Sequence, residues 1–282
     1  MMRIVVPIKQ VPETNAVKMD EATGTMIREG VEAIVNPLDL YAIEAAIRLR
    51  EAHGGQVVAI SMGPPKADRA LREAIAMGCD AGVLISDKAL AGSDTWATSY
   101  VLAAAIRKLA GGAGVRSAPP TPASQSGIDL VICGERATDG DTGQVGPGIA
   151  SFLDLPVATY VSRIEHVGEG LCRLRRLVED GYEVLEVGTP CVLTVVKEIA
   201  DPRLPTLRGK LRAKAENIPV WGVSELGVEA SKVGLEGSPT RVVRIFKPKV
   251  ARECLKLPAK DEQSLHQAVE KLVAFLQEKQ LV

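Results

Sequence analysis

Residues 130–147 read Leu-Val-Ile-Cys-Gly-Glu-Arg-Ala-Thr-Asp-Gly-Asp-Thr-Gly-Gln-Val-Gly-Pro, and the rest of the chain is organised around them. The first four residues are typical of a buried strand, and residues 148–153 are typical of a helix. The loop between them, residues 134–147, is rich in Gly, Asp and Thr. Glycine lets backbone N–H groups approach an anion, and a helix N-terminus carries partial positive charge. The stretch therefore suits a phosphate group, although a plain polar turn has the same composition.

Apolar runs alternate with helix-like segments before and after this loop. Asn36 and Pro37 are suited to the N-cap and first position of a helix that ends before Gly54-Gly55. The alternation predicts an α/β fold with a doubly wound, mostly parallel sheet. We expect the strands at 3–8, 56–61, 81–85, 129–133 and 156–159, and further helices at 66–77, 96–109 and 148–153.

The pattern changes after residue 162. Residues 163–167, 171–177 and 182–187 are separated by glycine turns, which predicts a short antiparallel addition over about 162–188. The apolar run 189–196 is a further strand that can rejoin the main sheet. We therefore expect a nucleotide-binding α/β domain over residues 1–196.

Ligands of such sheets bind beyond the carboxyl ends of the strands. The residues at these ends are small, polar, Pro or Gly: Pro7–Lys9, Ser61–Gly63, the segment before Asp94, and 134–146. We expect them to line one crevice.

The C-terminal third has weaker periodicity. Residues 197–258 are expected to form a loop and an extended arm. Basic residues in 203–214 make either a solvated face or a docking surface. An arm that packs on another subunit would cover the apolar residues Trp221, Leu226, Val228, Val233, Ile245 and Phe246. Residues 259–282 form an amphipathic helix with Leu265, Val269, Leu272 and Leu276 on one stripe. The Gly-, Ala-, Pro- and Ser-rich stretch 111–127 is expected to be a surface loop.

Composition excludes several classes of function. The net charge is −1 and aromatic residues make up 3%, which argues against nucleic-acid binding. The 5 cysteines are scattered and the 3 histidines lie far apart, so we expect buried thiols in a reducing cytoplasm, and no zinc site. The sequence contains no run of 18 apolar residues, so we expect no membrane span. The chain is expected to be cytoplasmic.

The sequence lacks the common catalytic and nucleotide motifs. It contains no GxGxxG after the first strand, no GxxxxGK[ST] and no GxSxG. Asp139 and Asp141 are better suited to shaping a turn than to acid–base catalysis. We therefore predict no catalytic side chain, and a binding or electron-carrying role in which a cofactor supplies the chemistry. A stand-alone ATP- or AMP-binding sensor or hydrolase on the same sheet is the alternative of another class.

Several motifs together resemble those of the β subunit of electron-transfer flavoproteins, nearly from end to end. The motifs are Val6–Pro12, Asn36–Ala42, Met62–Pro65, Gly134–Pro147, Asp201–Arg203, Thr206-Leu207 and Arg212–Lys214. The resemblance implies an adenine-nucleotide α-hydrolase-like sheet and a heterodimer with an α subunit that carries the redox flavin. It also implies a β-subunit site for a structural AMP or, in electron-bifurcating members, a second FAD.

The stretches Ser86–Lys88 and Gly92–Thr98 are similar to those of the bifurcating branch. Asp94, Thr95 and Thr98 would extend the site past an AMP-sized ligand, whereas helix capping is their alternative role. The resemblance implies that backbone N–H groups of residues 143–145 bind the phosphate. The full set of cofactor-binding residues that it implies is Pro7, Lys9, Asn36, Asp39, Ser61, Met62, Gly63, Asp94, Thr95, Thr98, Ala137, Thr138, Asp139, Gly140, Asp141, Thr142, Gly143, Gln144, Val145 and Gly146.

For a bifurcating member, the resemblance implies a reaction in which NADH first delivers a hydride to the β-subunit FAD. One electron goes to ferredoxin or flavodoxin, and the other goes through the α-subunit FAD to an acyl-CoA dehydrogenase-type partner. A non-bifurcating carrier with AMP is the alternative within the family. The resemblance also implies a dehydrogenase-docking segment over Val195–Arg203, with Ile199 as its apolar anchor and Arg203 beside it.

Overall fold

The computed structural model describes residues 2–13, 18–19, 26–27, 33–111, 127–243 and 254–282. The chain divides into two compact units, residues 1–243 and 244–282. The second unit contains the amphipathic helix predicted from its apolar stripe, α7 (Glu262–Glu278), and the Asp261 carboxylate accepts a hydrogen bond from the Ser264 N–H at 2.8 Å. The described helices include none that is both long and apolar enough to cross a membrane.

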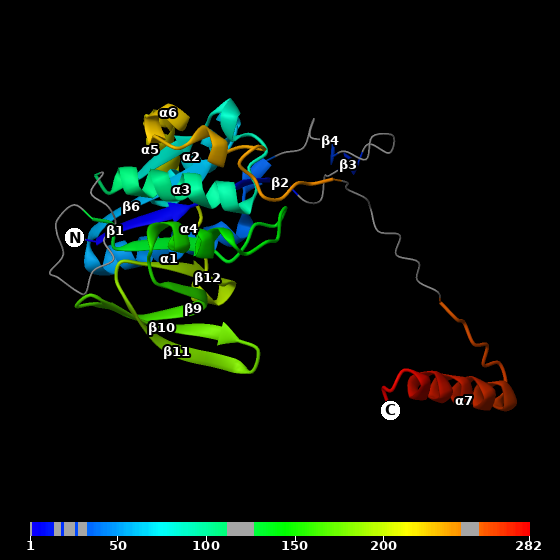
Figure 1. The fold of residues 1–282 in the computed structure, drawn as a ribbon. Coiled ribbons are helices and arrows are strands. Elements are labelled where there is room, and N and C mark those ends of the chain that lie inside the picture. Colours follow the sequence, from blue (N-terminus) through cyan, green and yellow to red (C-terminus); the bar gives the residue numbers. More distant parts are fainter. Residues whose placement is uncertain (1, 14–17, 20–25, 28–32, 112–126, 244–253) are drawn as a thin grey trace. The chain divides into compact units, whose positions relative to one another are not determined.

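In its described part, the first unit is built on a nine-stranded sheet of order β11-β10-β9-β12-β8-β1-β6-β7-β13 (Figure 1). The strands from β12 to β13 run parallel, as the alternation of strands and helices predicts. The bounds of this parallel set are β1 (Met2–Pro7), β6 (Gly55–Met62), β7 (Ala81–Ile85), β8 (Leu130–Gly134), β12 (Cys191–Val195) and β13 (Val220–Trp221).

Helices cover both faces of the sheet, and each face has its own apolar core. Val6, Ala59 and Ile132 face the cluster that contains α1 (Pro37–His53), α2 (Asp68–Met77) and α5 (Leu207–Ala215). Side chains on alternate positions of the same strands pack with α3 (Thr95–Leu109), α4 (Val145–Leu153) and α6 (Val223–Leu226). The doubly wound α/β fold is thereby confirmed.

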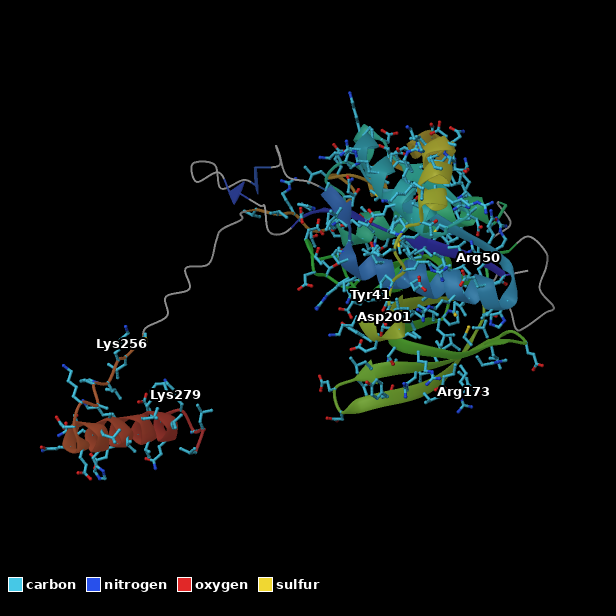
Figure 2. The ribbon with its side chains drawn as sticks, turned by 180° about the vertical axis from the view of Figure 1, so that it is seen from behind. Tyr41, Arg50, Arg173, Asp201, Lys256 and Lys279 are labelled. Atoms are coloured by element: carbon cyan, nitrogen blue, oxygen red, sulfur yellow. The ribbon has the colours of Figure 1, made fainter. Side chains whose placement is uncertain are left out.

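The helix boundaries follow the local signals in the sequence. Helix α1 begins after Asn36 with Pro37 in its first turn, and it ends at Gly54 with φ 69°. Arg50 near its C-terminal end, labelled in Figure 2, donates to the Gly78 carbonyl at 2.7 Å and to Asp80 Oδ1 at 2.9 Å. This pair of bonds ties the end of α1 to the chain that enters β7.

The antiparallel addition consists of β9 (Val157–Gly168), β10 (Leu171–Val178) and β11 (Gly181–Gly188). We expected separate strands at 156–159 and 163–167, but β9 is one strand that pairs parallel with β12 and antiparallel with β10. Register shifts at Arg173/Leu174 and Arg175/Arg176 interrupt its pairing with β10. Such irregularities bend a strand and increase its twist.

Residues 197–243 belong to the first unit, whereas an arm was expected from residue 197. Strand β13 pairs with the sheet edge at β7, and Val228 and Val233 are buried in the α3–α4 core. Trp221 and Leu226, which we expected to pack on another subunit, are partly buried against the same core. Ile245, Phe246 and positions 112–126 of the expected surface loop lie outside the described residues.

Short elements complete the first unit. Strands β2 (Gln10–Pro12) and β5 (Ala33–Val35) pair antiparallel, as do β3 (Lys18–Met19) and β4 (Met26–Ile27). The β2–β5 pair connects the exit of β1 with the start of α1, the two segments from which the candidate site is built.

Candidate functional site

The carboxyl ends of the central parallel strands lie at one edge of the sheet. Pro7 pairs with Ile60, and Val195 pairs with Gly134. The exits of β1, β6, β8 and β12 therefore leave the sheet side by side. Pro7 is buried within β1, so its side chain belongs to the sheet, whereas Lys9 beyond it is exposed.

Three chain segments meet at this edge around two buried polar residues, Asn36 and Asp39. The Lys9 N–H donates to Asp39 Oδ2 at 2.7 Å, and Asn36 Nδ2 donates to Asp39 Oδ1 at 2.9 Å. Asn36 Nδ2 also donates to the Arg136 carbonyl at 2.9 Å, and Asn36 Oδ1 accepts from the Thr138 N–H at 3.2 Å. The exit of β1, the start of α1 and the loop 134–147 are thereby held in one network.

The Asp39 carboxylate lies in a confined space. Burial raises its pKa to about 7, and the neighbouring Asp139 acts in the same direction. The bonds from Asn36 and Lys9 and the Lys9 charge act in the opposite direction. Gly134 packs directly on it, because a Cβ there would overlap Asp39 Oδ1 and would lie 2.9 Å from the Leu38 carbonyl carbon.

The acids of the loop shape its conformation and meet basic side chains. Lys9 Nζ lies 2.6 Å from Asp139 Oδ1, and Arg136 Nε lies 3.2 Å from Asp141 Oδ1. The Asp141 N–H bonds the Ala137 carbonyl at 2.8 Å, and Asp141 itself has a φ of 53°. These contacts agree with the expected turn-forming role. The exposed Lys9 ammonium is a cation that an anionic ligand can share with Asp139.

The loop ends at the N-terminus of α4, where it meets the N-terminus of α3. Gly143 has a φ of 63°, a conformation that glycine adopts easily. The chain turns there, and α4 begins directly after Gln144. Thr95 Oγ1 lies 3.4 Å from Thr142 Oγ1, and Ser99 Oγ donates to the Thr95 carbonyl at 2.7 Å. A Cβ on Gly148 would overlap Ser99, so the first turns of the two helices are in close contact.

Asp94 caps α3, as its alternative role predicts. Its Oδ1 accepts from the Ala97 N–H at 3.0 Å. Its Oδ2 accepts from the Thr240 N–H at 2.9 Å and from the Thr240 hydroxyl at 2.8 Å. Nothing in the local sequence indicated Thr240, which is 146 residues away. The Thr98 N–H bonds the Asp94 carbonyl at 2.9 Å as part of the same first turn.

The exit of β6 supplies a buried polar atom. The Ser61 hydroxyl is fully buried and has no hydrogen-bond partner among the described residues. Met62 is half-buried, and the Gly63 N–H bonds the Ile85 carbonyl at 3.0 Å. A buried hydroxyl usually has a partner. The Ser61 hydroxyl, the glycine-rich loop and the α4 N-terminus fit a polar, anionic ligand at this edge.

Within the described part of the chain, no three His, Cys, Asp or Glu side chains gather in a metal-binding group. A family model described as the electron transfer flavoprotein domain matches residues 23–226. The chain belongs to the electron transfer flavoprotein family.

Named relatives agree with this assignment over most of the chain. The electron transfer flavoprotein subunit beta of Thermoanaerobacterium thermosaccharolyticum is 46% identical over 252 residues, which cover 89% of this chain and 90% of the relative. The caffeyl-CoA reductase-Etf complex subunit CarD of Acetobacterium woodii is 46% identical over 248 residues, covering 88% of each. The subunit beta of Megasphaera elsdenii is 42% identical over 277 residues, covering 97% of this chain and 98% of the relative.

In this electron transfer flavoprotein chain, the two residues expected in the docking segment are engaged within the first unit. Ile199 is partly buried against the α1–α2 core. Arg203 donates to Glu44 Oε2 at 2.8 Å and to Glu51 Oε1 at 2.6 Å. Their docking role stays a prediction, and the apolar anchor implied by the resemblance, Ile199, is partly buried.

Three nearby leucines are exposed instead. The relative exposures of Leu204, Leu207 and Leu211 are 85%, 77% and 63%. The spacing of four residues places Leu207 and Leu211 on one side of α5, and Leu204 lies in the chain that enters this helix. This spacing is visible in the sequence and could have identified the surface.

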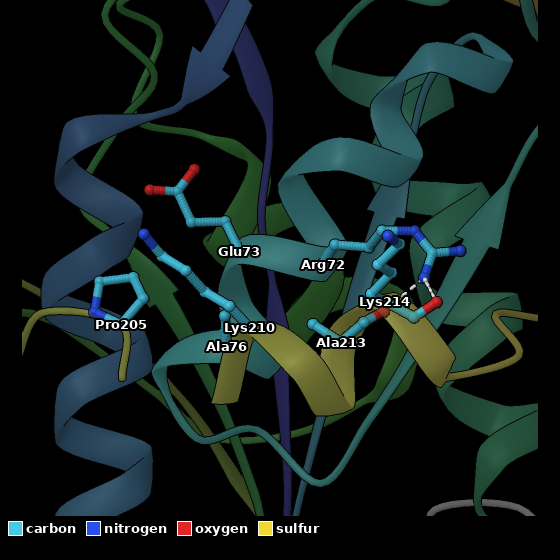
Figure 3. A pocket seen from close by; sticks show the side chains of 7 residues that line it. All are labelled: Arg72, Glu73, Ala76, Pro205, Lys210, Ala213 and Lys214. Atoms are coloured by element: carbon cyan, nitrogen blue, oxygen red, sulfur yellow. Dashed lines mark hydrogen bonds between the residues drawn. The ribbon is translucent and has the colours of Figure 1, made fainter. Parts of the chain in front are cut away.

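Beside these leucines, a cavity of about 550 Å³ opens between α2 and α5 (Figure 3). The Arg72 guanidinium contributes to its wall and bonds Asp68 Oδ2 at 2.7 Å and the Glu216 carbonyl at 3.3 Å. The side chains that line the cavity are Arg72, Glu73, Ala76, Pro205, Lys210, Ala213 and Lys214. Leu204, Leu207, Leu211 and this cavity are called the α5 surface below.

Proposed function

We propose that this chain is the β subunit of a cytoplasmic, heterodimeric, electron-bifurcating flavoprotein and holds FAD at the carboxyl edge of its sheet. When bound there, the flavin would take a hydride from NADH and supply the redox chemistry. Electrons would be divided between a low-potential acceptor, ferredoxin or flavodoxin, and the α-subunit flavin. The observation that carries the proposal is the close contact between α3 and the start of α4. Ser99 Oγ donates to the Val145 carbonyl at 3.3 Å, and Thr95 Oγ1 lies 3.4 Å from Thr142 Oγ1, so the polar edge extends beyond one phosphate site.

The residues at this edge would bind and orient the cofactor. Backbone N–H groups at the start of α4 would hold a phosphate, and Lys9 would balance its charge. The buried Ser61 hydroxyl would find its missing partner in a polar group of the ligand. The printed name of the Acetobacterium woodii relative, a subunit of a caffeyl-CoA reductase-Etf complex, supports a role beside an acyl-CoA-type dehydrogenase.

Counting bound nucleotides tests this proposal directly. The chain is produced together with its α subunit, and the nucleotides are released by acid and separated by chromatography. We expect two FAD per heterodimer and rapid reduction of flavin by NADH. The control for the spectral change on flavin reduction is the same heterodimer mixed with a non-reducing analogue in place of NADH.

Two results would contradict the proposal in different ways. One FAD and one AMP, with no reduction by NADH, would identify a non-bifurcating carrier. A monomeric chain that binds and hydrolyses ATP with Mg²⁺ without flavin would identify a stand-alone nucleotide-binding protein.

We also propose that the α5 surface docks a dehydrogenase-type partner. Leu207→Ala should raise the KM for the partner dehydrogenase about tenfold, because an exposed apolar anchor contributes to binding only in the complex. Its free energy of unfolding should change by less than about 0.5 kcal/mol. Electron transfer to the dehydrogenase, followed by dye reduction, measures the KM, and urea unfolding measures the stability.

Ile199→Ala is the matched comparison, since it also removes an aliphatic side chain. Because Ile199 packs against the core, this change should lower the free energy of unfolding by about 1 kcal/mol. Its effect on the KM should be smaller than that of Leu207→Ala. The opposite ranking of the two KM values would return the docking site to the segment around Ile199.

A further inference from the structure

The orientation of the Asn36 amide is determined by its neighbours. Its Oδ1 accepts the Thr138 N–H at 3.2 Å, so this end of the amide is the oxygen. Its Nδ2 consequently faces both the Arg136 carbonyl and Asp39 Oδ1, each at 2.9 Å. A rotated amide would place an NH₂ group against the Thr138 N–H and would lose these bonds.

This orientation determines which form of Asp39 the network accepts. Asp39 Oδ1 accepts a hydrogen bond from Asn36 Nδ2, and Asp39 Oδ2 accepts one from the Lys9 N–H at 2.7 Å. Each oxygen therefore faces a donor. Protonation of either oxygen would remove the negative charge and weaken the hydrogen bond that this oxygen accepts. The arrangement therefore favours an ionised carboxylate.

The contacts on Asp39 leave little freedom for rearrangement. Its side chain is buried and packs on the Cα of Gly134 at the start of the loop. The Asn36 N–H also bonds the Lys9 carbonyl at 2.8 Å, and the Lys9 N–H bonds Asp39 Oδ2, so Lys9 is joined to both Asn36 and Asp39. A change at Asp39 is therefore transmitted to Lys9 and, through Asn36, to residues 136–138.

We propose that Asp39 is a positioning residue whose negative charge holds the loop 134–147 in the form that retains nucleotide, so that acidification accelerates nucleotide release. The proposal rests on the nucleotide site of the proposed function and adds its regulation by pH. Asp39 acts through Asn36 and Lys9, which touch the loop.

The charged and titratable groups facing Asp39 come from several elements. Lys9, from the exit of β1, favours the charged carboxylate, whereas Asp139, from the loop, disfavours it. Cys133, from β8, also interacts with Asp39, and burial raises the pKa of its thiol, so it is neutral. Because burial raises the pKa of Asp39 to about 7, the change of charge falls in the neutral range.

The pH dependence of the global stability has the opposite direction to the effect proposed for the loop. The folded-state pKa of Asp39 lies above its ordinary value, so the folded chain binds more protons than the unfolded chain between the two values. Through this group alone, acidification from above pH 7 increases global stability. Faster release of nucleotide at acid pH would therefore report on the loop and not on unfolding.

The test uses the purified heterodimer with the nucleotides that it carries. The release rate of the β-site nucleotide is measured by filtration and chromatography from about pH 8 to about pH 6 at constant ionic strength. We expect release to accelerate about tenfold over this range, because the protonated fraction of a carboxyl with a pKa of about 7 rises about tenfold between these two pH values. Asp39→Asn should release nucleotide rapidly with little dependence on pH, since its NH₂ group would oppose a donor.

Two further variants test whether the effect depends on the contacts of Asp39. Asn36→Ala retains Asp39 but removes its connection to residues 136–138, so its pH dependence should be weaker than that of the wild type. Asp180→Asn, an exposed change in the turn between β10 and β11, should retain the wild-type profile. Thermal unfolding of each variant at each pH separates release from loss of fold.

Two outcomes would overturn the inference separately from the proposed function. A nucleotide that stays bound with a flat pH profile would contradict the role of Asp39 while leaving the nucleotide site intact. An unchanged pH slope in Asp39→Asn would do the same. If the heterodimer carried no nucleotide in this chain at any pH, the proposed function and this inference would both be wrong.

Discussion

Replacing Glu44 by alanine is expected to lower the free energy of unfolding by about 2 kcal/mol, because it removes a buried carboxylate that accepts hydrogen bonds from two charged arginines. Only 3% of the Glu44 side chain is exposed. Its Oε1 accepts from Arg48 Nε at 2.7 Å, and its Oε2 accepts from Arg203 Nε at 2.8 Å. The Arg203 N–H adds a bond at 3.1 Å. Without Glu44, the chain after β12 loses its main attachment to α1. Urea unfolding followed by circular dichroism measures the effect.

The contribution of Glu44 should also depend on pH. Burial acts to raise the pKa of this carboxyl, but the hydrogen bonds from Arg203 and Arg48 outweigh burial, so the pKa lies below its ordinary value. A lowered folded-state pKa gives stability that is present above the ordinary value and is lost as the pH falls through the folded-state value. The difference between wild type and Glu44→Ala should therefore shrink in acid below the ordinary pKa of glutamate.

Glu51→Ala is the matched control for this prediction. Glu51 bonds the same arginine, with Arg203 Nη1 at 2.6 Å from its Oε1, but 48% of its side chain is exposed. An exposed pair contributes about 0–1 kcal/mol, so this variant should remain close to wild type. Equal losses in the two variants would show that the burial of Glu44 does not determine the strength of the attachment.

Replacing Gly134 by alanine is expected to release the β-site nucleotide at least about tenfold faster and to lower the free energy of unfolding by about 1–3 kcal/mol. The added Cβ would overlap Asp39 Oδ1 and would lie 2.9 Å from the Leu38 carbonyl. Because both groups belong to the first turn of α1, the methyl group has to displace the helix or the loop. Nucleotide content after gel filtration and urea unfolding measure the two effects.

Gly140→Ala makes the same chemical change within the same loop. A Cβ at Gly140 has only Lys9 Nζ within reach, at 4.0 Å. This variant should keep its stability, and it should release the nucleotide less rapidly than Gly134→Ala. If both alanine variants lost nucleotide equally, sensitivity of the whole loop would explain the loss better than the contact between Gly134 and Asp39.

Much of the α/β core was predictable because its signals are local. The Asn36-Pro37 start of α1, its Gly54 end and the cap of α3 at Asp94 depend on neighbouring residues. The buried strands were visible as continuous apolar runs, which parallel sheets covered on both faces require. Alternation then predicted the doubly wound arrangement and the edge at which the loop 134–147 lies.

The region after residue 197 was less predictable because its order depends on partners far away in the chain. Strand β13 has two residues and forms only by pairing with β7. Val228 and Val233 have no helical or strand period, yet the α3–α4 core buries them. Sequence reasoning consequently assigned these residues to an arm covered by another subunit.

The sequence by itself determined the central strands, the helices that cover them and the loop that follows β8, because capping, glycine turns and apolar periodicity act over a few residues. Only the tertiary structure decided what the polar groups do. It brought Lys9 and the loop 134–147 onto Asn36 and Asp39, joined Thr240 to Asp94, and engaged Arg203 with Glu44. The physical reason is that hydrogen bonds and burial depend on distances of a few ångströms between residues up to 159 positions apart.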